Sequence, residues 1–124
     1  MRKFVILGAN GMLGTDLLTA CKSIYDIDVR GLVHTPEHSD LDITRLDAVS
    51  RVVGSLSPDV VLHCAAHTDV DGCELDPDKA YQINALGTRN VALACRKSGA
   101  ALVYFSTDYV FDGKRSEPYR EWDP

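Results

Sequence analysis

Three glycines at regular spacing, Gly8, Gly11 and Gly14, form a GxxGxxG pattern directly after a short apolar run. The first would let the chain turn sharply out of a strand. The second would leave room for a pyrophosphate beside the backbone, and the third would let a helix pack closely on a sheet. The free amides and the dipole at the start of that helix favour a phosphate there. The pattern therefore predicts a dinucleotide site, and the alternative is an ordinary glycine-rich turn between a strand and a helix.

The residues about twenty positions further on bear on the choice of dinucleotide. In the simplest dinucleotide-binding folds, an acidic side chain in this region holds the adenosine ribose. Residues 32–35 carry no carboxylate, so no acidic group in this segment opposes the 2′-phosphate of NADP. His34 and Arg30 are candidates to accept that phosphate, and an exposed polar loop is the alternative. NADP and NAD therefore both stay open as the cofactor.

Two histidines, His63 and His67, lie four positions apart, a spacing that some metal sites use. They straddle the predicted end of a strand and do not share one helix face, so no metal site is expected. The cysteines form no CxxC pair, which fits a reducing cytoplasmic compartment. Two of them, Cys21 and Cys95, fall on the apolar faces of predicted helices and are expected in the core.

The composition is that of a soluble globular domain. Of 124 residues, 45% are hydrophobic and 25% are charged, and the net charge is −5. No cluster of lysine and arginine indicates a nucleic-acid surface, and no apolar run reaches the length needed to cross a membrane. We therefore expect a cytoplasmic protein that has neither nucleic acid nor a membrane as its partner.

Short apolar runs alternate with segments of helical periodicity along the whole chain. Such alternation, with strands that are apolar throughout, predicts an α/β fold: a Rossmann-like doubly wound parallel sheet of about five strands with helices on both faces. Asp76 and Pro77 are typical of a helix start and Gly99 of a helix end. The expected strands are residues 3–7, 27–33, 60–62 and 101–105, with a very short one near 39–41. The expected helices are residues 11–24, 45–56 and 77–98, with a loop at 65–75 and turns from 106 to 124.

Three longer motifs carry more information than the glycines do, and they follow one another along the chain. They are PDVVLHCAAHTDVD at residues 58–71, NALGTRN at 84–90, and STDYVFDG at 106–113 followed by Pro118, Tyr119 and Glu121. The first and the third resemble the dTDP-4-dehydrorhamnose reductase family, an extended branch of the short-chain dehydrogenases/reductases. The second resembles the helix motif of the extended branch in general.

The resemblance implies a fold, a cofactor and an activity. Residues 1–124 would be the NAD(P)-binding Rossmann domain of such a protein, incomplete at its C-terminal end. The parent would reduce a 4-keto nucleotide sugar, dTDP-4-dehydrorhamnose, to dTDP-rhamnose with NADPH or NADH. Its partner would be that dTDP-linked sugar substrate.

The resemblance also implies a role for each matching residue. Thr107 would be the catalytic hydroxyl that hydrogen-bonds the substrate carbonyl, and Asp108 and Tyr109 would flank the sugar. Asn84 would tie the central helix to the floor of the site beside the cofactor, although it could merely bond a neighbouring loop. The other residues implied to line the cofactor are Gly8, Asn10, Gly11, Met12, Leu13, Gly14, Asp42, Ile43, Ala65, Ala66 and Thr68.

The family's proton donor does not have a match in this sequence. In the family a tyrosine supplies the proton, four positions before a lysine whose charge lowers the pKa of the tyrosine. None of the five tyrosines is followed by lysine at that spacing. We therefore expect this chain to be an N-terminal fragment that ends before the pair and is not a competent enzyme alone.

Two other functions stay open. One is a non-catalytic, dinucleotide-binding regulatory subunit like the β subunit of methionine adenosyltransferase. The other is a different nucleotide-sugar enzyme of the extended branch, an epimerase or a dehydratase, against which the run STDYVF at residues 106–111 argues. An uncovered edge of the truncated sheet would also favour a homo-oligomer.

Overall fold

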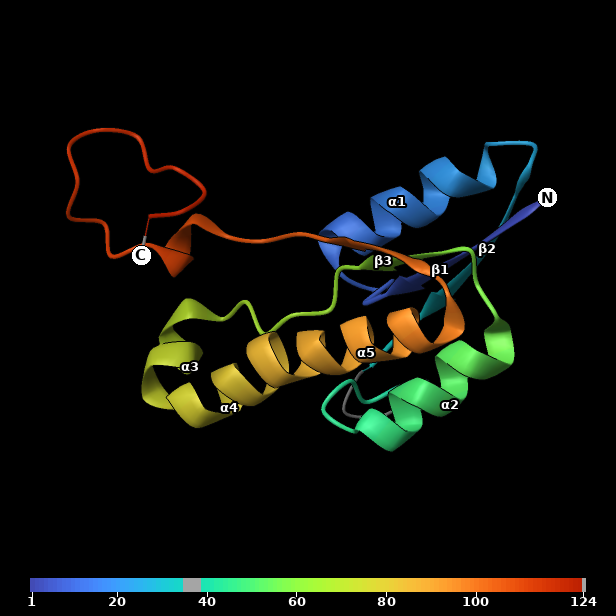
Figure 1. Cartoon of the computed structure of the whole chain (residues 1–124), viewed down its shortest axis with the longest axis horizontal. Helices are drawn as coiled ribbons and strands as arrows, with labels where there is room; N and C mark the ends of the chain where they lie inside the picture. Colours follow the sequence, from blue (N-terminus) through green and yellow to red (C-terminus); the bar gives the residue numbers. More distant parts are fainter. Residues whose placement is uncertain (35–38, 124) are drawn as a thin grey trace.

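The computed structural model of this chain describes residues 1–34 and 39–123. Its centre is a sheet of four parallel strands in the order β2-β1-β3-β4 (Figure 1). The strands are β1 (Arg2–Leu7), β2 (Ile27–Leu32), β3 (Val60–His63) and β4 (Ala101–Tyr104). The chain runs outward from β1 to β2 and then returns to the other side of β1. The strand order therefore reverses between β1 and β3, which is where such sheets place their ligands.

Helices cover both faces of this sheet, as the alternation predicted. Helix α1 (Met12–Lys22) lies on one face, and α2 (Leu46–Leu56) and α5 (Thr88–Ser98) lie on the other (Figure 1). Successive residues of β1 divide between the two layers, because side chains of a strand alternate in direction. Leu7 packs with the core on the α2 and α5 side, and Ile6 packs with the core on the α1 side. Cys21 and Cys95 are buried in these two cores, which confirms that expectation.

The expected short strand near residues 39–41 is not part of the sheet. His34 and Ser39 form only an isolated antiparallel bridge, and the amide of Asp40 donates to the carbonyl of Val33 at 2.9 Å. The segment instead anchors itself through Leu41, whose side chain is buried in the core. The described residues thus contain four strands, fewer than the expected five, because residues 39–41 make only this isolated bridge and do not pair along the sheet.

The segment after β3 differs from the expected loop in its second half. Residues 70–75 form helix α3 (Val70–Leu75), whose first turn is capped by the carboxylate of Asp69, the acceptor for the amide of Gly72. The predicted helix at 77–98 is helical throughout, but in three parts. It consists of α4 (Pro77–Tyr81), a π-helical segment η1 (Gln82–Gly87) and α5. Asp76 caps α4, and Gly99 ends α5 in the left-handed conformation, as expected.

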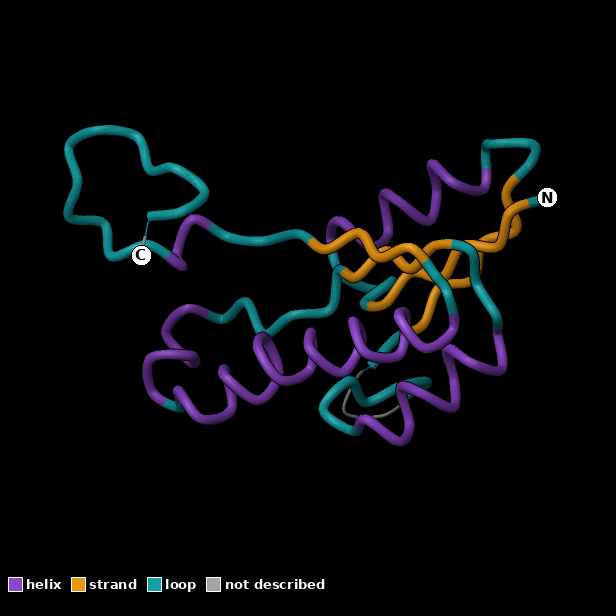
Figure 2. Tube along the Cα trace, viewed as in Figure 1, coloured by secondary structure: helices purple, strands orange, loops and turns teal. Residues whose placement is uncertain are grey.

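The chain after β4 leaves the body of the molecule. A 3₁₀ turn, η2 (Asp108–Val110), is followed by a loop of residues 111–123 that stands apart from the helices (Figure 2). The rings of Phe111 and Tyr119 stack with centroids 4.3 Å apart, and the Tyr119 hydroxyl donates to Asp112 at 2.7 Å.

Among the described residues, no helix is long and apolar enough to cross a membrane.

Candidate functional site

The turn between β1 and α1 lies at the carboxyl end of the central strand. Gly8 has a φ of 76°, which side chains disfavour, and a Cβ on it would lie 2.7 Å from the amide nitrogen of Ala65. A Cβ on Gly14 would lie 2.1 Å from the carbonyl oxygen of Gly8. The turn is therefore built to hold α1 against the sheet and β3 against the turn, which places the start of α1 beside the switch point.

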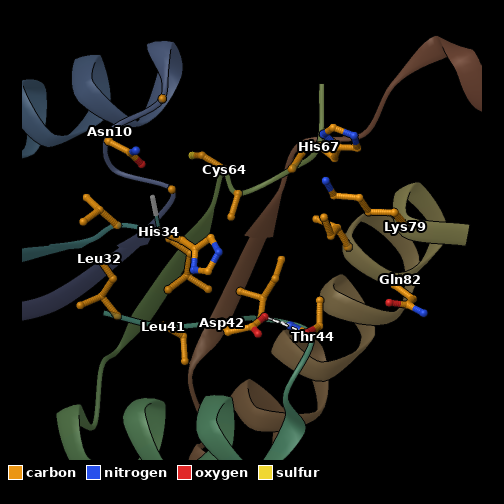
Figure 3. Close-up of a pocket in the computed structure, with 18 residues that line it drawn as sticks. Asn10, Leu32, His34, Leu41, Asp42, Thr44, Cys64, His67, Lys79 and Gln82 are labelled. Atoms are coloured by element: carbon orange, nitrogen blue, oxygen red, sulfur yellow. Dashed lines mark hydrogen bonds between the residues drawn. The ribbon is translucent and has the colours of Figure 1, made fainter. Parts of the chain in front are cut away.

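A first pocket of about 510 Å³ opens above the carboxyl ends of β1 and β3 (Figure 3). It brings together segments that are far apart in the sequence: the glycine turn, the loop after β2, the loop after β3 and the helix α4. His34 also lines it, with its Nδ1 2.6 Å from the hydroxyl of Ser39, whereas Arg30 is exposed on β2 and lines neither this pocket nor its neighbour. The predicted site residues that line it are Gly8, Asn10, Gly11, Asp42, Ile43, Ala65 and Ala66.

A second pocket of about 660 Å³ adjoins the first on the side of β4. Five lining residues are common to both pockets, so the two are halves of one groove that crosses the switch point. Of the three residues predicted around the sugar, Thr107 and Tyr109 line this half and Asp108 does not. The other predicted site residues along it are Gly11, Met12, Leu13, Gly14, Ala65, Ala66, Thr68 and Asn84.

Asp42 offers an ionised acceptor in the first half of the groove. Its Oδ1 accepts hydrogen bonds from the amide and the hydroxyl of Thr44, at 2.9 and 2.7 Å. Partial burial acts to raise the pKa of this carboxyl, but the Thr44 hydrogen bonds and the electrostatic interactions with His34 and Arg45 outweigh it and hold the pKa below its ordinary value. At neutral pH the group can accept a further hydrogen bond, such as one from the amino group of a base.

Asn84 holds the loop that follows β3. Its Oδ1 accepts from the amide of His67 at 2.8 Å, and its Nδ2 donates to the carbonyl of the same residue at 3.0 Å. The side chain comes from the π-helical segment η1, a geometry that is frequent at functional sites. Asn84 therefore makes the bond to a neighbouring loop that the sequence analysis gave as the alternative to a role beside the cofactor. The same loop carries Ala65 and Ala66, which line both pockets.

His63 is a buried residue of the second half that the sequence reading did not place in the site. It is 1% exposed, its Nε2 lies 3.0 Å from the hydroxyl of Thr88, and its ring centroid is 5.5 Å from that of Tyr104. Burial lowers the pKa of this imidazole to about 4, so the ring is neutral at physiological pH. The signal for burial in the sequence was the position of His63 at the end of an apolar run.

Within the described part of the chain, no group of histidine, cysteine and carboxylate side chains could hold a metal.

Residues 1–124 match the family described as the RmlD substrate binding domain, over the full sequence. The chain belongs to this family. Named relatives are similar to this chain in sequence, and solved structures are similar to it in fold. The spore coat polysaccharide biosynthesis protein SpsK of Bacillus subtilis is 40% identical over 124 residues, which is 100% of this chain and 42% of that protein.

Two solved structures extend this comparison of the RmlD-family chain. The dTDP-4-dehydrorhamnose reductase of Bacillus anthracis, in complex with NADP, is 43% identical, with a TM-score of 0.84 over 98% of this chain and 42% of that one. The UDP-glucose 4-epimerase of Thermus thermophilus, in complex with NAD, is 25% identical, with a TM-score of 0.78 over 93% of this chain. The chain thus spans about two fifths of the length of these relatives, and it shares their Rossmann-like fold.

Proposed function

We propose that this chain is the dinucleotide-binding part of a reductase that acts on a dTDP-linked 4-keto sugar, with NADPH or NADH as the cofactor. The observation that carries the proposal is the groove across the switch point, which the glycine turn, Asp42 and Thr107 all line. The reductase of Bacillus anthracis, which binds NADP, supports it through its 43% identity to this chain.

The lining of the groove fits an extended dinucleotide. The glycine turn and the start of α1 would hold the pyrophosphate, because the first amides of a helix lack partners within that helix and the glycines place no side chain beside the backbone. Asp42 and Ile43 would hold the adenine at one end. Met12 and Leu13 would lie beside the nicotinamide half, in the pocket that Thr107 also lines. The small residues Ala65 and Ala66 let the backbone after β3 come close to the cofactor along both halves.

The bound dinucleotide supplies the hydride of the reaction. Thr107 would orient the substrate by donating a hydrogen bond from its hydroxyl to the ketone oxygen, which draws electron density toward that oxygen. Its Oγ1 also accepts from the amide of Tyr109 at 3.2 Å, and its hydroxyl donates to Oδ1 of Asp108 at 3.4 Å, a long hydrogen bond that the substrate oxygen would replace. This chain would bind the cofactor and orient the carbonyl group. It would not donate the proton, because no tyrosine precedes a lysine by four positions.

The parent protein would work in the cytoplasm, and this chain would associate with itself. The four free cysteines fit a reducing compartment. Strand β4 lies at the edge of the sheet, and Val103, Tyr104 and Phe105 on and after it are 42–44% exposed. Such an apolar edge favours association. Light scattering after size-exclusion chromatography would test this part of the proposal, and a monomer at all concentrations would contradict it.

A calorimetric titration with NADPH and NADH tests the cofactor site. Gly14→Ala should abolish binding, because its Cβ would approach the Gly8 carbonyl oxygen to 2.1 Å. Gly54→Ala is the matched control, because a Cβ at this glycine of α2 meets no atom within 4 Å. Circular dichroism would show that both variants are folded. Equal affinities of the two variants, or no binding by the unaltered chain, would contradict the proposed site.

A further inference from the structure

Lys79 is a cation on the wall of the first pocket. It belongs to α4, and its ammonium forms no ion pair with the carboxylates of the residues that the structure describes. We propose that Lys79 is a phosphate-binding residue of this pocket, whose ammonium contacts a phosphate of the bound dinucleotide. This inference rests on the proposed function and adds a residue to it that none of the sequence motifs indicated.

The charge balance of the groove carries the proposal. Asp42 is ionised and lines the same pocket, where it would oppose a ligand that brings at least two negative charges of its own. Among the described residues that line the two pockets, Lys79 is the one lysine or arginine. The whole sequence has a net charge of −5, so the rest of the surface does not supply the missing positive potential. A polyanion in this groove therefore depends on Lys79 for the one full positive charge that lines it.

A hydrogen bond fixes the backbone of Lys79, and its side chain extends into the first pocket. The carboxylate of Asp76 accepts a hydrogen bond from the Lys79 amide at 3.0 Å, which fixes the first turn of α4. From there the side chain points into the pocket, with its ammonium on the side of His67 and with Asn10 and His34 on the opposite wall (Figure 3). A flexible stem that ends in three N–H donors suits a phosphate oxygen, and the contact is charge-assisted.

Two phosphates of NADPH offer the same chemistry, namely the pyrophosphate and the 2′-phosphate. Titration of each variant with NADPH and with NADH distinguishes them, because NADH lacks the 2′-phosphate. Lys79→Met removes the charge and keeps the stem and the helix propensity. We expect it to weaken NADPH binding about tenfold. An equal loss for NADH assigns the contact to the pyrophosphate, and a loss confined to NADPH assigns it to the 2′-phosphate.

Two further variants and a salt series separate a phosphate contact from a structural role. Lys79→Arg should restore affinity to within about threefold of the unaltered chain, because the positive charge is kept. Lys97→Met is the matched control, because this exposed lysine near the end of α5 lines neither pocket. Affinity should also fall less steeply with salt in Lys79→Met than in the unaltered chain. A loss of packing would leave the salt dependence unchanged.

The outcomes that overturn the inference are distinct from those that overturn the proposed function. If the unaltered chain binds NADPH and Lys79→Met binds it equally well, the inference is wrong and the cofactor site stands. The same holds if Lys79→Met and Lys79→Arg weaken binding alike with an unchanged salt dependence. If the unaltered chain binds neither NADPH nor NADH, the proposed function and this inference fall together.

Discussion

The side-chain amide of Asn84 bonds both backbone polar groups of His67, one at 2.8 Å and the other at 3.0 Å. The pair joins the π-helical segment η1 to the loop after β3, across 17 residues of sequence. That loop forms the wall shared by the two halves of the groove. The shape of the candidate site therefore depends on one amide side chain that touches the loop by two hydrogen bonds.

Asn84→Ala should lower the free energy of unfolding by about 1–3 kcal/mol, because the partly buried His67 amide loses its acceptor and the His67 carbonyl keeps only the weak thiol donor of Cys73. It should also weaken NADPH binding, since the loop loses its support. Asn84→Asp keeps an acceptor for the His67 amide but sets a carboxylate oxygen against the His67 carbonyl, so this substitution should not restore the stability. Urea unfolding monitored by circular dichroism, together with calorimetric titration, would measure both effects. Equal stability of Asn84→Ala and the unaltered chain would contradict this account.

Asn90 supports the segment that presents Asp42. The side chain is 5% exposed, and its Nδ2 donates to the carbonyls of Ile43 at 3.0 Å and Thr44 at 3.1 Å. Asn90→Ala should therefore cost about 1–3 kcal/mol of unfolding free energy, because the Ile43 carbonyl stays buried without a donor. Arg89→Ala, one residue earlier on the exposed side of α5, should change it by less than about 0.5 kcal/mol. Denaturant melts of the two variants compare them directly, and similar midpoints would exclude a supporting role for Asn90.

His63 makes the stability of the fold depend on pH. Burial depresses its pKa to about 4 in the folded chain, against an ordinary value of 6.5. Between these values the unfolded chain binds more protons than the folded chain does, so stability should be complete above pH 6.5 and should fall as the pH is lowered to 4. The expected loss is about 3 kcal/mol over this window.

Unfolding free energies measured from pH 7 to pH 4 would test this dependence on His63. His63→Gln should lose most of the pH dependence, because the glutamine side chain does not titrate. His67→Gln removes a half-buried histidine, and this variant should keep the pH dependence of the unaltered chain. If the unaltered chain and His63→Gln show the same slope with pH, His63 is not its source.

Tyr119 sets the acidity of Asp112 in the C-terminal loop. Its hydroxyl donates to Asp112 at 2.7 Å, and this hydrogen bond, helped by the amide of Lys114, holds the pKa of the Asp112 carboxyl below its ordinary value. Tyr119→Phe keeps the stacked ring and should raise the pKa of Asp112 toward the ordinary value. Tyr109→Phe, which changes another exposed tyrosine, should leave the pKa of Asp112 unchanged. Carboxyl chemical shifts followed by NMR through an acid titration would show which tyrosine controls Asp112.

The local signals in the sequence predicted most of the secondary structure. Apolar runs located β1–β4, helical periodicity located α1, α2 and α5, and the caps at Asp76 and Gly99 are as expected. The errors fall where an element is too short to show a period. Residues 70–75 form a helix of six residues, too few for a periodic apolar face, and the Asp69 carboxylate caps its first turn. Residues 39–41 do not form a strand of the sheet, because Ser39 makes only an isolated bridge with His34.

The sequence by itself thus determined the kind of sheet, the glycine turn and the motifs of the RmlD family, because each is written in neighbouring residues. Only the tertiary structure decided which distant side chains share the groove. Asn10, Asp42 and Lys79 come from three separate segments, the turn after β1, the loop after β2 and α4, and they line one pocket because β1 lies between β2 and β3 in the sheet. The neutral state of His63 is likewise a tertiary property, since burial between β3, β4 and α5 removes the water that would stabilise its charged form.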